Sequence, residues 1–267
     1  MSTAGPPQGA QHRSAQREGT PVTLLAFDTS TEAMSIALGD AQQVWQHTAA
    51  GGAQASATLI PSVLALMAEA GKGWGDLQAI AFGSGPGAFT GLRTACSVAQ
   101  GLAFGASLPV LPVDTLLAVA EEARTLQSPP SGAPLQVMAL LDARMDEIYA
   151  AAYRHDGLAW VACSPLRVAR PEDLCLPDGW RAEEVLLAGN VFDTYGTRLG
   201  FAPAARRCAA LPTATAMLRL APALLAQGLA VPPEQALPVY IRDKVAQTTS
   251  ERAALRAAPL SAPPSAA

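Results

Sequence analysis

Two acidic residues stand at the ends of predicted buried strands, a position from which carboxylates can hold Mg²⁺ and the phosphates of a nucleotide. Asp28 follows the apolar and β-branched run 22–27, and Asp142 follows a similar run at 136–141. Asp and Thr also begin ordinary turns, and the residue types alone favour that simpler interpretation. The pattern of strand, Asp and hairpin nevertheless occurs once in each half. This duplication predicts a shared fold more strongly than it predicts retained phosphate chemistry.

A glycine-rich segment, GSGPGA at residues 83–88, lies between a predicted strand and a predicted helix at 90–104. It matches the GxGxxA variant of the dinucleotide-binding fingerprint. The context argues against that function, because Pro86 removes a backbone donor and the next acidic residue is Asp114. The chain also contains no Gly-Lys-Ser/Thr phosphate loop. We therefore interpret the segment as a tight crossing that needs a positive φ, with Thr90 capping the next helix.

Side chains with nucleophilic or metal-binding chemistry are scattered along the sequence. The three histidines, His12, His47 and His155, form no HxxxH or HExxH pattern, and no GxSxG nucleophile elbow is present. The four cysteines form no CxxC pair and are expected to be reduced thiols, at least some of them buried. The sequence therefore predicts no metal site and no catalytic residue.

The composition predicts a large core and no nucleic-acid-binding surface of its own. Half of the 267 residues are hydrophobic, 15% are charged, and the net charge is −4. The arginines form no basic cluster of the kind that grips nucleic acid. No apolar run approaches the roughly 20 residues that a membrane helix needs, and residues 1–20 carry no apolar leader segment. We expect a cytoplasmic protein that does not enter a membrane.

The predicted elements fall into two similar halves. Strands at 22–27, 34–38 and 43–48 form a β-meander, which differs from the strand, turn and helix that open a dinucleotide-binding fold. The segment QSPPSGAP at 127–134 is the best linker in the chain, and a strand ending in Asp begins again after it. The predicted organisation is a disordered tail at 1–20, a first lobe at 21–125, a linker at 126–135, a smaller second lobe at 136–247, and a disordered tail at 248–267.

Four segments resemble those of one protein family. The block FGSGPGAFTGLR at 82–93 closely resembles the signature loop and helix of the TsaB (YeaZ) proteins, and it is highly specific. LAFDTST at 25–31, DARMDEIY at 142–149 and PVYIR at 238–242 look like further segments of that family. The resemblance covers residues 22–247. It implies an α/β, actin-like ATPase (ASKHA, ribonuclease H-like) fold with two lobes.

The resemblance also implies a role. The family member is a non-catalytic dimerization subunit that pairs with a TsaD-like catalytic subunit and a TsaE-like ATPase. Together they form N6-threonylcarbamoyladenosine at position 37 of tRNAs that decode ANN codons. TsaD carries a histidine pair on its first helix for its metal, whereas residues 54–59 here contain no histidine. The family further implies a homodimer when the chain is alone, tRNA contact only through the complex, no intrinsic cofactor, and ATP or ADP at the complex interface.

Two predicted helices, 56–70 and 90–104, are apolar over a wider arc than a helix needs to cover a sheet. The excess face is covered either by another helix of this chain or by a partner, and the resemblance favours a partner. The residues expected at this interface are Leu59, Val63, Leu66, Met67, Leu92, Ala95, Ala99 and Leu102. Those expected at nucleotide or seam contacts are Asp28, Thr29, Ser30, Gly83, Gly85, Gly87, Thr90 and Arg93. Because Arg93 opposes the helix dipole, we also expect it to have a polar partner.

Two other functions remain open from the sequence. An ATP-dependent phosphotransferase of the actin-like, sugar-kinase fold would need a glycine-bearing phosphate loop in each lobe. The first-lobe turn lacks that glycine, and LAGN at 187–190 is only a fragment of a Gly-Gly adenosine loop. A peptidase would need a metal or a nucleophile, and neither is recognised in the sequence.

Overall fold

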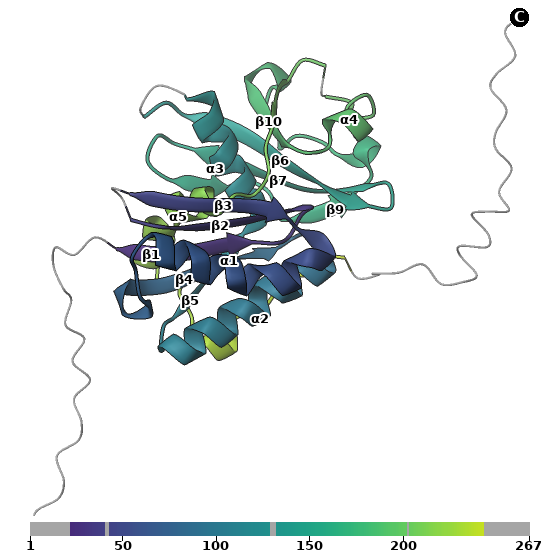
Figure 1. Cartoon of the computed structure of the whole chain (residues 1–267). Helices are drawn as coiled ribbons and strands as arrows, with labels where there is room; N and C mark the ends of the chain where they lie inside the picture. Colours follow the sequence, from purple (N-terminus) through teal and green to yellow (C-terminus); the bar gives the residue numbers. More distant parts are fainter. Residues whose placement is uncertain (1–21, 41–42, 129–131, 202, 243–267) are drawn as a thin grey trace, which may run out of the picture.

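The computed structural model describes residues 22–40, 43–128, 132–201 and 203–242. Within these ranges, two mixed sheets face each other across a central pair of helices, with further helices outside the first sheet (Figure 1). The predicted tails at 1–20 and 248–267 lie outside the described residues, as do residues 129–131 of the predicted linker.

The first sheet has the strand order β3-β2-β1-β4-β5. β1 to β3 form the predicted antiparallel meander, and β4 and β5 run parallel to β1. β1 is buried along its whole length because both faces of the sheet are covered, whereas β3 is an edge strand and largely exposed. The strands are β1 (Thr23–Asp28), β2 (Ala33–Gly39), β3 (Val44–Ala50), β4 (Leu77–Gly85) and β5 (Val110–Asp114).

Helices α1 (Ala55–Glu69) and α2 (Phe89–Ala106) cover one face of this sheet and lie side by side (Figure 1). The sequence placed both helices to within one or two residues. The prediction that Thr90 caps α2 is wrong. The N-cap is Ala88, which offers no side-chain acceptor, and Thr90 lies inside the first turn, where its own carbonyl accepts a bond from Thr94.

The second sheet repeats the topology of the first. Its order is β11-β10-β6-β7-β8, with β9 also pairing with β7. β6 and β7 form an antiparallel hairpin like β1 and β2, and β10 and β11 run parallel to β6 as β4 and β5 run parallel to β1. The duplication expected from the two strand-end Asp residues is therefore confirmed. The strands are β6 (Leu135–Arg144), β7 (Glu147–His155), β8 (Trp160–Ala162), β9 (Arg167–Ala169), β10 (Val185–Gly189) and β11 (Arg206–Ala209).

The central helices connect the lobes. α3 (Thr115–Gln127) packs against the second sheet, and α5 (Ala214–Ala226) packs against the face of the first sheet opposite α1 and α2. Residues 214–240, which the sequence assigned to the second lobe, thus return to the first sheet. A short helix, α4 (Phe192–Tyr195), lies at the outer side of the second sheet.

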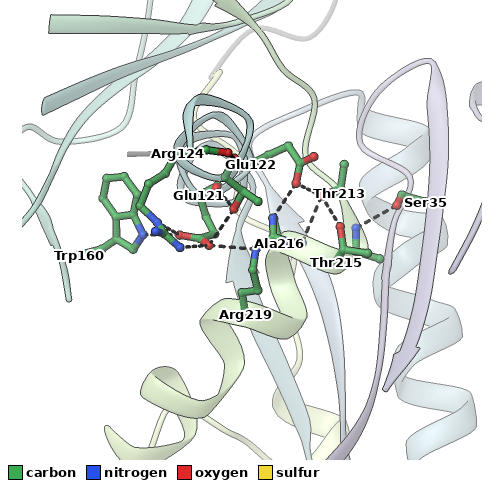
Figure 2. A network of polar contacts seen from close by, with 12 residues as sticks. Ser35, Glu121, Glu122, Arg124, Trp160, Thr213, Thr215, Ala216 and Arg219 are labelled. Carbon is green, nitrogen blue, oxygen red and sulfur yellow. Dashed lines mark hydrogen bonds and ion pairs between the residues drawn. The ribbon is translucent and has the colours of Figure 1, made fainter. Parts of the chain in front are cut away.

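Polar contacts join α3 and α5 to the second lobe (Figure 2). Glu121 of α3 is buried, and its carboxylate accepts hydrogen bonds from Arg124, from Arg219 of α5 at 2.9 Å, and from the indole of Trp160 at 3.0 Å. Burial alone would raise the pKa of Glu121, but the hydrogen bonds and charges of its partners hold that pKa below its usual value. The contacts attach α5 to α3.

Candidate functional site

The glycine-rich loop and the Asp28 turn pack together as one unit, although 55 residues separate Asp28 from Gly83 in the sequence. A Cβ on Gly83 would lie 1.8 Å from Asp28 Oδ2, and a Cβ on Gly87 would lie 2.6 Å from the Ser30 Cβ. Any side chain at either glycine would therefore collide with the turn. These glycines are needed because two backbone segments approach closely, and no bound phosphate is required to explain them.

Thr29 and Gly85 complete this packing. The hydroxyl of Thr29 is fully buried and donates to the Gly91 carbonyl of α2 at 2.7 Å. Gly85 has φ of +120°, and a Cβ there would lie 2.6 Å from the Val239 carbonyl oxygen. The positive φ predicted for this loop is therefore confirmed at Gly85.

The carboxyl group of Asp28 is sealed inside the first lobe. Its Oδ1 accepts bonds from the Ser30 amide at 2.9 Å and the Ser30 hydroxyl at 2.7 Å, while its Oδ2 is buried without a partner against the backbone of Gly83. Met217 of α5 packs on the same spot, because a Cβ on Gly83 would also touch its terminal methyl. Burial raises the pKa of Asp28 to about 6, although the two bonds from Ser30 act to lower it. Asp28, which was expected at nucleotide or seam contacts, is therefore buried out of reach of a ligand in this structure.

A cleft of about 430 Å³ does lie between the lobes, above this sealed unit. The first lobe contributes Ser30, Gly87 and the start of α2, and the second lobe contributes the β6–β7 hairpin and the end of β10. The last described residues of the chain form a further wall. The polar and charged residues that line the cleft are Ser30, Thr31, Glu32, Asp142, Arg144, Tyr149, Asn190, Tyr240 and Arg242.

Asp142 lines this cleft, but its charge is paired. Its Oδ2 lies 3.1 Å from the guanidinium of Arg144, and its Oδ1 accepts bonds from the Arg144 amide at 2.8 Å and the Tyr195 hydroxyl at 3.2 Å. Asn190 accepts a bond from the Asp142 amide at 2.9 Å. Asn190 was detectable as the residue that directly follows β10, whereas nothing in the sequence pointed to Tyr195.

The tip of the β6–β7 hairpin has an uncommon backbone conformation. Arg144, Met145 and Asp146 have φ values of 61°, 56° and 65°. These values lie in the left-handed region of the backbone, which residues other than glycine rarely adopt. Arg198 donates hydrogen bonds to the carboxylates of both Asp146 and Glu172, and it lowers the pKa of each. These ion pairs hold the hairpin in the position where Arg144 and Met145 line the cleft.

Arg93 lies outside the cleft, on a groove between α2 and the last described residues. Its Nε donates to the Tyr240 hydroxyl at 3.1 Å, and its guanidinium carbon lies 3.9 Å from the centre of the Phe89 ring. The predicted polar partner is confirmed as a phenol rather than a carboxylate. Of the predicted nucleotide or seam residues, Ser30 and Gly87 line the cleft; Asp28, Thr29, Gly83 and Gly85 are buried beneath it; Thr90 and Arg93 line the outer groove.

The predicted interface residues need correction. They form the inner faces of α1 and α2, where they pack into the core against the first sheet. Seven of them are buried, namely Leu59, Val63, Leu66, Met67, Leu92, Ala95 and Ala99. Leu102 is half-buried against the same core. These residues therefore cannot contact a partner directly. The outer faces do carry apolar side chains, because Ile60 is 41%, Leu64 48% and Phe104 79% exposed. Both sides of each helix are apolar, so periodicity could not tell the inner side from the outer.

Other chemical features of the described residues are few. Cys96 and Cys208 are buried, as expected for some of the thiols, and all four cysteines are free. Over the described ranges, no three His, Cys, Asp or Glu side chains lie close enough together to hold a metal ion. No helix within them is both long and apolar enough to cross a membrane.

Comparison with known proteins identifies the chain's relatives. Residues 41–250 match the family model of TsaD, tRNA N6-adenosine threonylcarbamoyltransferase. The tRNA threonylcarbamoyladenosine biosynthesis protein TsaB of Escherichia coli is 35% identical over 228 residues, which cover 84% of this chain and 96% of that protein. TsaB of Haemophilus influenzae is 41% identical over 128 residues, covering 48% of this chain and 52% of that protein.

Solved structures agree with this assignment. YeaZ from Pseudomonas aeruginosa is 40% identical, with a TM-score of 0.74 over 82% of this chain and 99% of that one. A second structure, described as an uncharacterized protein with similarity to peptidase YeaZ from Pseudomonas aeruginosa, is 39% identical, with a TM-score of 0.75 over 83% and 100% of the two chains. The duplicated two-lobe α/β architecture confirms the predicted actin-like, ribonuclease H-like fold. This chain belongs to the TsaB (YeaZ) family.

Proposed function

We propose that this chain is the non-catalytic dimerization subunit of a tRNA-modifying complex. It pairs with a TsaD-like catalytic subunit and a TsaE-like ATPase, and the complex forms N6-threonylcarbamoyladenosine at position 37 of tRNAs that decode ANN codons. The relatives named for threonylcarbamoyladenosine biosynthesis support this assignment. We place the reaction in the cytoplasm. Since the chain has a net charge of −4, tRNA contacts the complex through other subunits.

The sealed position of Asp28 is the observation that carries the non-catalytic role. In a phosphotransferase of this fold, a strand-end carboxylate must reach the water shell of Mg²⁺ and the phosphates. Here the side chain of Asp28 is 0% exposed, and its Oδ2 packs against the backbone of Gly83 near the Met217 side chain. A phosphotransferase function therefore has little support.

We assign the partner surface to the outer faces of α1 and α2. Ile60 and Leu64 project from α1, and Phe104 projects from α2 next to the exposed Gly101, which lets another helix approach closely. An exposed apolar patch of this kind usually marks a protein contact. The TsaD family model itself matches this chain over residues 41–250, so a TsaD-like partner shares its fold. One surface could then serve a homodimer and, when the partner is present, a heterodimer.

We further propose that the chain has no intrinsic cofactor and that ATP or ADP binds at the complex interface. The cleft between the lobes opens beside α2, so a partner on α2 would lie close to its mouth. Arg144 and Arg242 line the cleft and supply positive charge for phosphate, although Asp142 and Glu147 already pair with them. Phosphate would have to compete with these carboxylates, so binding by the isolated chain should be weak.

A reconstitution tests this function. An ANN-decoding tRNA and threonylcarbamoyl adenylate are mixed with this chain, with a TsaD-like and a TsaE-like protein from the same genome, or with all three. Formation of the modified nucleoside is measured by mass spectrometry. We expect none with this chain alone, and efficient modification only when this chain and the TsaD-like protein are both present. Turnover by this chain alone would contradict the proposal, and so would full activity of the other two proteins without it.

A further inference from the structure

Residues 236–242, here called the strap, run from the first lobe to the second along the mouth of the cleft. They form no helix or strand. On the first lobe, the Ala236 carbonyl accepts a bond from the side chain of Gln100 at 2.9 Å, and the Val239 amide donates to the Ser84 carbonyl at 2.7 Å. Both contacts are made by the strap's own backbone, so they fix its path independently of most of its side chains.

The other end of the strap is attached to the second lobe. Ile241 packs against the core that α3 forms with the second sheet. The guanidinium of Arg242 donates to the carboxylate of Glu147 and, at 3.2 Å, to the Arg144 carbonyl, and it lies 6.0 Å from the centre of the Tyr149 ring. The Arg242 side chain is only 14% exposed. Its charge is therefore largely removed from water, and separating it from Glu147 would be costly.

Between these attachments, Tyr240 reaches from the strap onto the outer groove of α2 and is 47% exposed. Tyr240 receives the hydrogen bond from Arg93, and its ring lies 5.3 Å from the ring of Phe89 on the outer groove of α2. Tyr240 also lines the cleft, together with its neighbours Val239 and Ile241. A shift of Tyr240 on the outer surface must therefore move the wall of the cleft on the inner side.

We propose that the strap transmits contact on the outer groove of α2 to the β6–β7 hairpin on the far side of the cleft. A protein bound over Arg93 and Tyr240 would hold Tyr240 in place, and through Arg242 it would hold the hairpin that carries Arg144. The identity of that protein rests on the proposed function, but the coupling is a property of this chain alone. If the strap only filled space, a substitution at one end would change the exchange rates at that end and leave those at the other end unchanged.

Hydrogen–deuterium exchange of the full chain without any partner tests the coupling. Arg93→Ala removes the bond to Tyr240 from an exposed position, so the fold should remain intact. We expect exchange to become about fivefold faster in residues 236–242 and also in the hairpin at 142–147. A factor of about five is what the loss of one ordinary hydrogen bond contributes to a local opening equilibrium. Thr94→Ala is the matched control, because Thr94 bonds to the Thr90 carbonyl within its own helix.

The coupling must also act in the reverse direction. Glu147→Gln weakens the second-lobe attachment, and we expect it to speed exchange at the Val239 amide. Glu183→Gln is the control, since Glu183 pairs with the exposed Arg181 on the same lobe and away from the hairpin. The proposal is overturned if Arg93→Ala affects the strap and leaves the hairpin unchanged, or if Glu147→Gln leaves the Val239 amide unchanged. These outcomes do not depend on whether a TsaD-like partner binds.

Discussion

The Oδ2 atom of Asp28 lies against the backbone of Gly83, only 1.8 Å from the position that a Cβ on Gly83 would take. The contact joins the two sequence motifs of the first lobe into one packed unit. It also explains why the strand-end carboxylate is out of reach of the cleft above it.

Gly83→Ala should destabilise the protein, because the new methyl group has no room beside Asp28 and the Met217 methyl lies only 3.1 Å from its position. Forcing one extra carbon into a packed site typically costs about 1–3 kcal/mol. Urea unfolding of the purified chain measures the change. Gly105→Ala is the control: its Cβ would meet nothing within 4 Å on the exposed side of α2, and it should be neutral or stabilising by up to about 1 kcal/mol. Equal stability of Gly83→Ala and wild type would contradict the packing.

The pKa of Asp28 predicts a pH dependence of stability. The pKa of Asp28 is about 6 in the folded protein, whereas the ordinary pKa of an aspartate is 3.8, so between these pH values the folded state binds more protons than the unfolded state. Stability from this group is therefore present below about pH 4 and is lost as the pH rises to about 6, by an amount on the order of 3 kcal/mol. The side chain of the Asp28→Asn variant cannot ionise, so the variant does not lose this stability as the pH rises. The measurement is the difference in unfolding free energy between the two proteins at pH 4 and pH 7, and a difference independent of pH would rule out the raised pKa.

Substitutions on opposite sides of α1 should separate folding from association. Leu64→Glu places a charge on the outer face, so we expect a folded chain that neither self-associates nor binds a TsaD-like protein. Met67→Glu buries a charge in the core and should unfold the chain or reduce its stability by several kcal/mol. Circular dichroism and light scattering distinguish the two results. Leu158→Glu, at a residue 94% exposed on the second lobe, is the surface control. Normal association of Leu64→Glu would place the interface elsewhere.

Arg219→Ala should weaken the attachment of α5 to α3. It leaves the buried carboxylate of Glu121 without one of its two cationic partners and removes the 2.7 Å contact of Arg219 with Glu122. Losing a partner of a buried charged group typically costs about 1–3 kcal/mol. Thermal unfolding checks this value against Arg181→Ala, whose ion pairs are exposed and whose loss should cost less than about 0.5 kcal/mol. A cost no greater than that of the control would show that the network in Figure 2 does not hold α5.

The sequence predicted the fold well because the strands are continuous apolar runs that end in turn residues. It missed β11, whose residues RRCA lie at a sheet edge and are mostly exposed, so no apolar run marks it. It also assigned α5 to the second lobe, since proximity in the chain gave no hint that the helix returns to the first sheet. The two-lobe actin-like architecture came from the family resemblance and the repeated strand-end Asp rather than from periodicity.

The candidate site was harder to predict than the fold. The positions of Asp28 and Asp142 relative to their strands were predicted, and both residues do end or nearly end a strand. The difference between the two residues arises from the tertiary structure. Asp28 packs against Gly83 near Met217, whereas Asp142 lies at the cleft and pairs with Arg144. No local pattern encodes that difference, because Met217 lies almost 190 residues from Asp28.

The most direct test of the central claim is the activity of a complex that contains the Asp28→Asn chain. If this subunit does no chemistry, a neutral side chain of the same shape should support tRNA modification at a rate within about twofold of wild type, provided that the complex forms to the same extent. Residues that act directly in chemistry typically contribute factors of about 10² or more. A loss of that size by the Asp28→Asn complex, at equal complex concentration, would show that Asp28 is catalytic and that the sealed site opens during the reaction.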